Sequence, residues 1–180
     1  LTFVVVSSDA KKAMTERKTP VASFYANLTT FAHYYEEKWF PYTMPISDIY
    51  GLRAAIDNIA DDPGILTRHA KIAAASQKAI TGAGLKLYLH SGYSSTVTVF
   101  EVPECTTAAA ILDGVKKDYN IMLAGSFDVL AGKVIRIGHM GNNATFYNVC
   151  EVFHALDGTL RKLGVALTGS MEEIFCENMK

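Results

Sequence analysis

One arginine beside several glycines is the feature of this sequence that could do chemistry. Arg136 stands between Ile135 and Ile137 in a short β-branched run, and Gly138 and Gly141 follow it closely. An arginine can bind a carboxylate through two parallel hydrogen bonds, and glycines let the backbone approach a ligand. Alternation along a strand places Arg136 on the face opposite its isoleucine neighbours. The spacing alone leaves open a second interpretation, an arginine on a solvated outer face.

Other familiar catalytic patterns are missing from the sequence. The five histidines show neither H-x-H nor H-E-x-x-H spacing, so we expect no metal site. Cys105, Cys150 and Cys176 form no C-x-x-C pair, and we expect free thiols in a reducing cytoplasm. Neither a G-x-S-x-G elbow nor a phosphate-binding P-loop occurs.

Composition narrows the class of protein. The chain has 180 residues, of which 49% are hydrophobic and 19% charged, as in a globular protein with a substantial core. The net charge of -1 favours no nucleic-acid or membrane partner. No apolar run approaches the ~18 residues of a membrane span. Because the chain starts at Leu1 and directly in a β-like run, we interpret it as part of a larger protein.

The first third of the chain does not resemble a domain of its own. Residues 2–6 form a continuous apolar run, which is typical of a strand buried on both faces of a parallel sheet. Residues 24–40 are rich in aromatic side chains, which favours packing in a core or an interface. Residues 46–60 have the apolar periodicity of a helix. We assign residues 1–62 to the trailing part of a large α/β domain plus a connecting helix.

The rest of the chain, residues 63–180, predicts a small α+β domain. Four segments have strand character: residues 85–89, 96–102, 120–124 and 134–137. Four segments predict helices: residues 65–81, a segment capped by Thr106 or Thr107 that runs to about 117, residues 145–163, and a short one from about 170 onward. The order of these elements predicts a small, mainly antiparallel sheet with helices on one face.

Several segments together resemble the class V aminotransferases of the alanine–glyoxylate, serine–pyruvate and pyridoxamine–pyruvate type. Residues 133–141, KVIRIGHMG, are similar to the closing motif of that family. Residues 41–45, 49–55 and 96–103 are similar to further family segments in the family's order. The resemblance covers nearly the whole chain. It implies the C-terminal portion of a pyridoxal-phosphate enzyme with the aspartate-aminotransferase-like fold.

The resemblance also implies roles for individual residues. Arg136 corresponds to the arginine that binds the substrate α-carboxylate. Thr43 corresponds to the residue that reaches the cofactor phosphate of the partner subunit in a homodimer. Tyr42 lies next to it, while Phe40 occupies a position where the family often has tyrosine. The substrates implied are a small amino acid and a 2-oxo acid, pyruvate or glyoxylate.

The family's Schiff-base lysine has no counterpart in this chain, because it precedes the strand that residues 2–6 resemble. We therefore expect the chain by itself to be inactive. Two alternatives stay open. One is a non-catalytic dimerisation or binding module, favoured by the aromatic residues 24–40. The other is a pyridoxal-phosphate lyase or cysteine desulfurase of the same fold, which ranks lower because nothing around Cys105 indicates activation.

Overall fold

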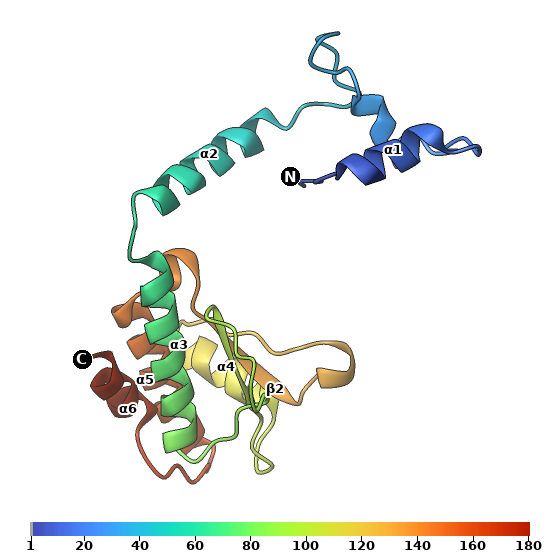
Figure 1. The fold of residues 1–180 in the computed structure, drawn as a ribbon. Coiled ribbons are helices and arrows are strands. Elements are labelled where there is room, and N and C mark those ends of the chain that lie inside the picture. The colour runs from blue at the N-terminus through green and yellow to red at the C-terminus, as the bar shows by residue number, and fades with distance from the viewer. Residues whose placement is uncertain (1) are drawn as a thin grey trace. The chain divides into compact units, whose positions relative to one another are not determined.

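The computed structural model describes residues 2–180 and divides the chain into two compact units (Figure 1). The first unit ends at Asp62 and the second runs from Pro63 to Lys180. The first unit contains helix α1 (Ser8–Glu16), the short 3-10 helix η1 (Leu28–Phe31) and helix α2 (Ile46–Ala60). Helix α1 begins where the side chain of Ser7 accepts the backbone N–H of Ala10 at 3.1 Å.

Residues 2–6 do not form the predicted buried strand. Among the described residues no strand pairs with this segment, and Phe3, Val4 and Val5 are largely exposed. The prediction of a buried strand was wrong for this chain. β-branched residues favour an extended backbone, but a β-strand also needs a neighbouring strand with which to form hydrogen bonds.

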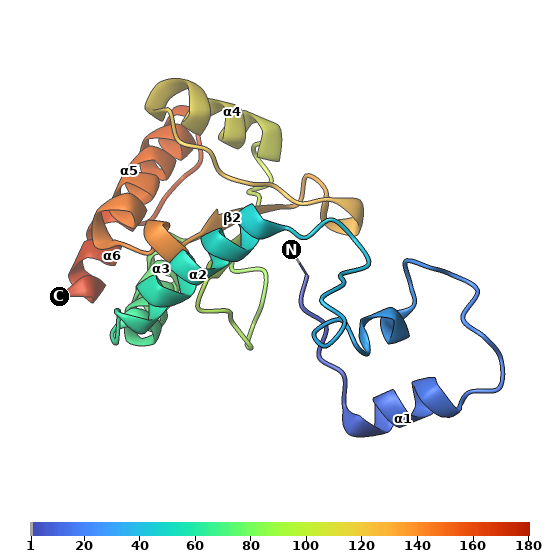
Figure 2. The same cartoon turned by 90° about the horizontal axis from the view of Figure 1, so that it is seen from above.

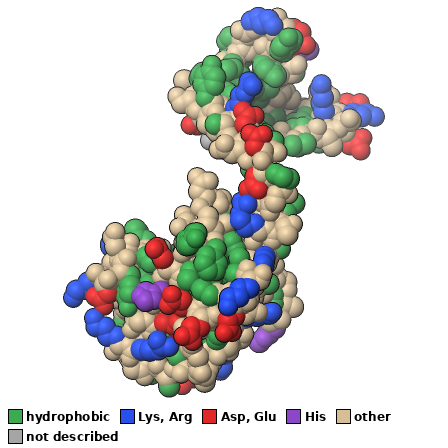
Figure 3. All heavy atoms as spheres, turned by 90° about the vertical axis from the view of Figure 1, so that its left-hand side faces the viewer, with side chains coloured by type: hydrophobic (Ala, Val, Ile, Leu, Met, Phe, Trp, Pro, Cys, Tyr) green, Lys and Arg blue, Asp and Glu red, His purple; other side chains and the backbone are tan. Residues whose placement is uncertain are grey.

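The first unit has no buried side chain among its described residues. The apolar face predicted for α2 is exposed throughout, including Ile49 and Ile56. The aromatic side chains of this unit instead contact one another: the rings of Tyr25 and Tyr42 stack at 5.3 Å between centroids. Figure 3 shows hydrophobic side chains at the surface of the molecule.

Within the described residues 63–180, the second unit has four α-helices and two strands. They are α3 (Ile65–Gly82), β1 (Val97–Glu101), α4 (Ala108–Tyr119), β2 (Val134–Gly138), α5 (Phe146–Lys162) and α6 (Met171–Met179). Short 3-10 helices η2 (Asp128–Leu130) and η3 (Gly141–Asn143) flank β2.

Hydroxyl caps fix the starts of three of these helices. Thr107, Thr145 and Ser170 each accept a backbone N–H of the following helix at 3.2 Å. Such a cap satisfies one of the N–H groups that the first turn of a helix leaves without a partner. The helix starts predicted at these residues are confirmed.

The sheet is smaller than predicted. Strands β1 and β2 pair antiparallel, with Val99 opposite Arg136. Residues 85–89 and 120–124 reach the sheet only through isolated antiparallel bridges, Leu87 to Phe100 and Ala124 to Arg136. These two segments therefore lie at the edges of the sheet, where short pairing is common.

The core of the second unit lies between the strands and the helices. The four helices gather on one side of the strands (Figures 1 and 2). Fully buried side chains come from both layers: Ile72, Ile80, Phe100, Ile135, Ile137, Phe153, Leu156 and Phe175. This arrangement is the small α+β fold with helices on one face that the sequence predicts. Over residues 2–180, no helix combines the length and apolar character that a membrane span needs.

Candidate functional site

Arg136 lies at the middle of β2, between β1 on one side and the segment that ends at Ala124 on the other. Its backbone N–H donates to the carbonyl of Ala124 at 2.7 Å, and its register partner on β1 is Val99. Its neighbours Ile135 and Ile137 are buried in the core, while Arg136 is only half-buried. Alternation along the strand therefore points Arg136 to the face opposite Ile135 and Ile137, as the sequence predicts. The backbone N–H and carbonyl of Arg136 both bond to Ala124, and this pair of hydrogen bonds holds the backbone in place.

The Arg136 side chain is oriented by the turn that follows residues 120–124. Its Nε donates to the carbonyl of Gly125 at 2.6 Å, and its guanidinium lies 5.8 Å from the centroid of the Phe127 ring. Within residues 2–180 its terminal Nη groups have no hydrogen-bond partner. The free edge of the guanidinium is thus the pair of Nη nitrogens, which suits end-on binding of a carboxylate.

A hollow of about 600 Å³ opens beside Arg136. Residues from segment 121–124, β2, the turn after β2 and the start of α5 line it: Ile121, Met122, Leu123, Ala124, Arg136, Gly138, Met140, Asn143, Asn148, Val149, Glu151 and Val152. The hollow is large enough for a small ligand, and its wall mixes apolar side chains with amides, the Arg136 cation and the Glu151 carboxylate.

The turn after β2 is fastened to α3 by two adjacent residues. Arg68 donates from Nε to the carbonyl of Ala144 at 3.0 Å. His69 lies with Nδ1 2.7 Å from the carbonyl of Ile65, and its Nε2 accepts the backbone N–H of Gly141 at 3.3 Å. The Nδ1–H tautomer satisfies both of these contacts. No local pattern in the sequence points to this role of His69, because the contact spans more than seventy residues.

His139 is a second histidine in this turn, and it is fully buried. Its Nε2 lies 2.9 Å from Oγ1 of Thr98, and its Nδ1 has no partner among the described residues. Burial lowers the pKa of His139, and the nearby His69 lowers it further. His139 is therefore neutral at pH 7 and supports the turn by packing and one hydrogen bond.

Thr43 and Tyr42 belong to the first unit. Thr43 is exposed, in an irregular segment just before α2. The Tyr42 hydroxyl lies 3.3 Å from the carbonyls of both Phe24 and Tyr25, so it donates to the chain itself. Thr43 consequently has the more accessible hydroxyl of the two.

Metal-binding clusters are absent from the described part of the chain. Over residues 2–180 no three histidine, cysteine or carboxylate side chains lie where they could hold an ion. Cys105 is exposed and free, and Cys150 and Cys176 are free and half-buried.

Comparisons with known proteins point mainly to aminotransferases, although no protein-family model matches the chain. It is 34% identical over 146 residues to an uncharacterized aminotransferase of Methanocaldococcus jannaschii, covering 78% of this chain and 37% of the relative. It is 38% identical over 108 residues to a serine–glyoxylate aminotransferase of Arabidopsis thaliana, covering 58% of this chain and 27% of the relative. The chain therefore spans well under half the length of the curated relatives it matches.

A solved structure agrees with these relatives. The crystal structure of pyridoxamine–pyruvate aminotransferase from Mesorhizobium loti matches this chain with a TM-score of 0.86 and 26% identity. The match covers 97% of this chain and 46% of that one. The predicted fold class, a small C-terminal α+β domain of an aminotransferase-like enzyme, is confirmed by this likeness.

Proposed function

Because the chain belongs to the class V aminotransferase family, we propose that the whole protein is a pyridoxal-phosphate-dependent aminotransferase. It moves an amino group between a small amino acid and a 2-oxo acid, either glyoxylate or pyruvate. The names of the relatives support both acceptors, since they include a serine–glyoxylate and a pyridoxamine–pyruvate enzyme.

The observation that carries this proposal is the geometry of Arg136. The carbonyl of Gly125 holds Nε at 2.6 Å, so the guanidinium keeps one orientation and turns its two Nη groups outward. An amino acid and a 2-oxo acid share a carboxylate next to the reacting carbon. One fixed arginine can therefore bind both substrates through the group that does not react, which places the reacting carbon at a constant position.

The residues of this chain that suit the cofactor are few. The exposed hydroxyl of Thr43 can donate to a phosphate oxygen, and we assign it to the cofactor phosphate of the partner subunit. Tyr42 is the weaker candidate, since its hydroxyl already donates within the first unit. When bound, pyridoxal phosphate supplies an electron sink for the bond that breaks at the α-carbon.

Catalysis needs residues that this chain does not supply. No lysine in it corresponds to the family's Schiff-base lysine, so we propose that residues 1–180 by themselves have no transaminase activity. The exposed rings and apolar face of the first unit support contact with other parts of a homodimer. Three free cysteines are consistent with our proposal of a cytoplasmic location.

The test is Arg136→Lys in the full-length protein. A lysine has one point-like ammonium instead of a planar fork, so about 1.5–3 kcal/mol of charged hydrogen bonding is lost. KM for the amino acid should then rise about 10- to 100-fold. Steady-state kinetics with the amino acid and glyoxylate or pyruvate would measure this change, and the cofactor absorbance should stay.

The matched control is Arg161→Lys, in the last turn of α5 and outside the hollow beside Arg136. It should leave KM unchanged. An unchanged KM in Arg136→Lys would remove Arg136 from the substrate site. A protein that releases sulfide or another elimination product, instead of transferring the amino group, would point to the lyase or desulfurase alternative.

A further inference from the structure

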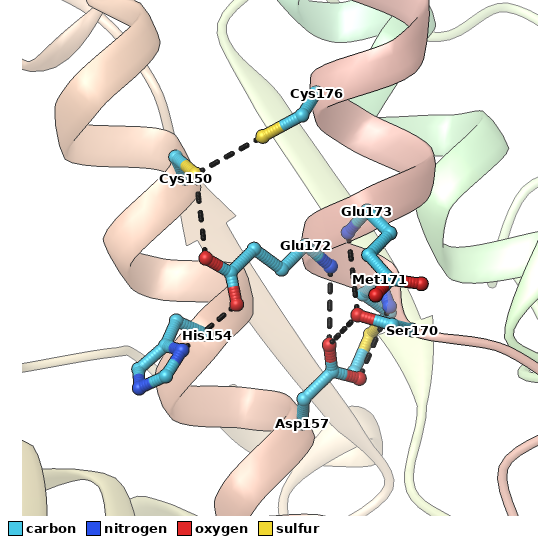
Figure 4. A network of polar contacts seen from close by, with 8 residues as sticks. All are labelled: Cys150, His154, Asp157, Ser170, Met171, Glu172, Glu173 and Cys176. Atoms are coloured by element: carbon cyan, nitrogen blue, oxygen red, sulfur yellow. Dashed lines mark hydrogen bonds and ion pairs between the residues drawn. The ribbon is translucent and has the colours of Figure 1, made fainter.

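Two of the three cysteines lie against each other across the interface of α5 and α6. The Sγ atoms of Cys150 and Cys176 are 3.2 Å apart (Figure 4). A disulfide bond is about 2.05 Å long, so the two sulfurs need to close by only a little over 1 Å. The helices that carry them are packed together, and the ring of Phe153 on α5 contacts that of Phe175 on α6 at 5.2 Å between centroids. The sulfurs are therefore held side by side by the core itself.

The thiols of Cys150 and Cys176 have different surroundings. Glu172 directs Oε1 to the Sγ of Cys150 at 3.9 Å, and its Oε2 lies 2.8 Å from Nδ1 of His154 (Figure 4). Burial, followed by the hydrogen bond and charge of Cys176 and the charge of Glu172, raises the pKa of the Cys150 thiol to about 12. Cys150 therefore keeps its proton at neutral pH. Because the Glu172 carboxylate lies against Cys150 and opposes loss of its proton, we assign the first attack to Cys176.

We propose that Cys150 and Cys176 form a redox-active dithiol, the α5–α6 dithiol, which hydroperoxides convert to an intramolecular disulfide. In the first step the Cys176 thiolate attacks a peroxide oxygen, which gives a sulfenic acid and releases water or an alcohol. In the second step Cys150 Sγ attacks the sulfenic sulfur, and its proton leaves with the hydroxide as water. The two thiols lose two electrons and the peroxide gains them, and a thiol reductant reverses the change.

The disulfide would fasten α6 at a second point. The first turn of α6 is already held by the Asp157 carboxylate, which accepts the backbone N–H groups of Met171 and Glu172 at 3.1 Å each. Cys176 lies further along the same helix, toward the end of the described chain. A bond there would prevent the last turns of α6 from leaving α5. The dithiol thus sets the stability of the C-terminal helix according to redox state.

Both thiols are half-buried and not sealed, so a small oxidant can reach them. Cys105 is exposed and offers the internal contrast, because it has no cysteine beside it. An oxidant that acted only by exposure would modify Cys105 first. If the short distance between the sulfurs decides the reaction, the oxidant should link Cys150 to Cys176.

The experiment treats the full 180-residue chain with hydrogen peroxide and measures its intact mass without reductant. A Cys105→Ser background removes linkage between molecules through the exposed thiol. The mass should fall by two hydrogen atoms, and dithiothreitol should restore it. Trypsin cleaves after Arg161 and Lys162, so a linked pair of peptides 137–161 and 163–180 identifies the bond, in the unsubstituted chain as well.

The order of the two steps has its own test. In Cys150→Ser the sulfenic acid on Cys176 has no partner, and a 1,3-dione should trap it. In Cys176→Ser the Glu172 carboxylate still lies against the remaining thiol of Cys150 and opposes its ionisation, so trapping should be lower than in Cys150→Ser. Equal trapping in the two variants would overturn the assignment of Cys176 as the reacting thiol.

Thermal unfolding shows whether the bond has the stabilising effect inferred here. The loop between the two cysteines spans 26 residues. Closing a loop of that length should raise the midpoint of unfolding by ~10 °C in the oxidised Cys105→Ser protein. Peroxide should not raise it in the matched Cys105→Ser/Cys150→Ser protein. The proposal is overturned by an unchanged mass, by added oxygen without the linked peptides, by a link between two chains, or by an unaltered midpoint.

Discussion

Asp157 is a buried carboxylate that fastens the start of α6, and its replacement gives a sharp test of the fold. Its side chain is 3% exposed and accepts three hydrogen bonds (Figure 4). Oδ2 accepts from Ser170 Oγ at 2.7 Å and from the N–H of Glu172 at 3.1 Å, and Oδ1 accepts from the N–H of Met171 at 3.1 Å. Two of these donors belong to the first turn of a helix, which has no partners for them within the helix.

The substitution Asp157→Asn keeps the shape and removes one acceptor. An asparagine has one oxygen and one NH₂ group, so one of the three donors must face another donor. If that donor is the buried Met171 N–H, the unsatisfied group costs about 1–3 kcal/mol. The lost charge at the positive end of α6 costs about 0.5–1 kcal/mol more. We expect a loss of about 2–3 kcal/mol in the free energy of unfolding.

Chemical denaturation of the 180-residue chain, followed by circular dichroism, would measure this loss. In Asp157→Asn the midpoint of thermal unfolding should also fall by ~10 °C, given a unit of about 120 residues. The control is Asp118→Asn, which removes an exposed ion pair with Lys162 at 2.7 Å and should have little effect. The reasoning would be refuted if Asp157→Asn were no more destabilising than this control.

Two further predictions concern the second unit. Burial lowers the pKa of His139, so below pH ~6.5 the unfolded chain takes up a proton at this residue while the folded chain does not. The free energy of unfolding should therefore decrease as the pH is lowered, by up to about 1.4 kcal/mol per pH unit. Denaturation from pH 7 to 5 should show a shallower fall in His139→Gln, and parallel curves would exclude this residue as the cause. Gly164 follows the end of α5 with φ +78°, a conformation that alanine rarely adopts. In a denaturant titration, Gly164→Ala should lose about 1 kcal/mol of unfolding free energy, and Gly164→Asn should lose less. Equal stability of the unsubstituted protein and both variants would contradict the need for glycine at this position.

Local patterns in the sequence were enough for the helices of the second unit. The hydroxyl caps at Thr107, Thr145 and Ser170 begin their helices as predicted. The inward set of α3, which includes His69 and Ile72, is buried as its spacing indicates. Both signals depend only on residues within a few positions of one another, and helical hydrogen bonds have the same short range.

Strands were predicted less well, because their bonds join distant residues. Residues 134–137 became β2, but residues 2–6 have no partner strand among the described residues and stay exposed. Residues 85–89 alternate as a strand does, yet only Leu87 forms a bridge. The assignment of residues 1–62 to a larger domain stays a prediction, as do the roles of Thr43 and Tyr42.

The sequence by itself determined the type of site: an arginine that alternates out of a buried strand, followed by a glycine turn. Composition, periodicity and family resemblance led to Arg136 without coordinates. Only the tertiary structure decided how that arginine is oriented. Gly125 occupies Nε and leaves the Nη groups free, and His69 fastens the turn from another helix. It also brought Cys150 and Cys176 to 3.2 Å. These contacts join residues far apart in the chain, and packing of the whole core sets their distances, which no local pattern encodes.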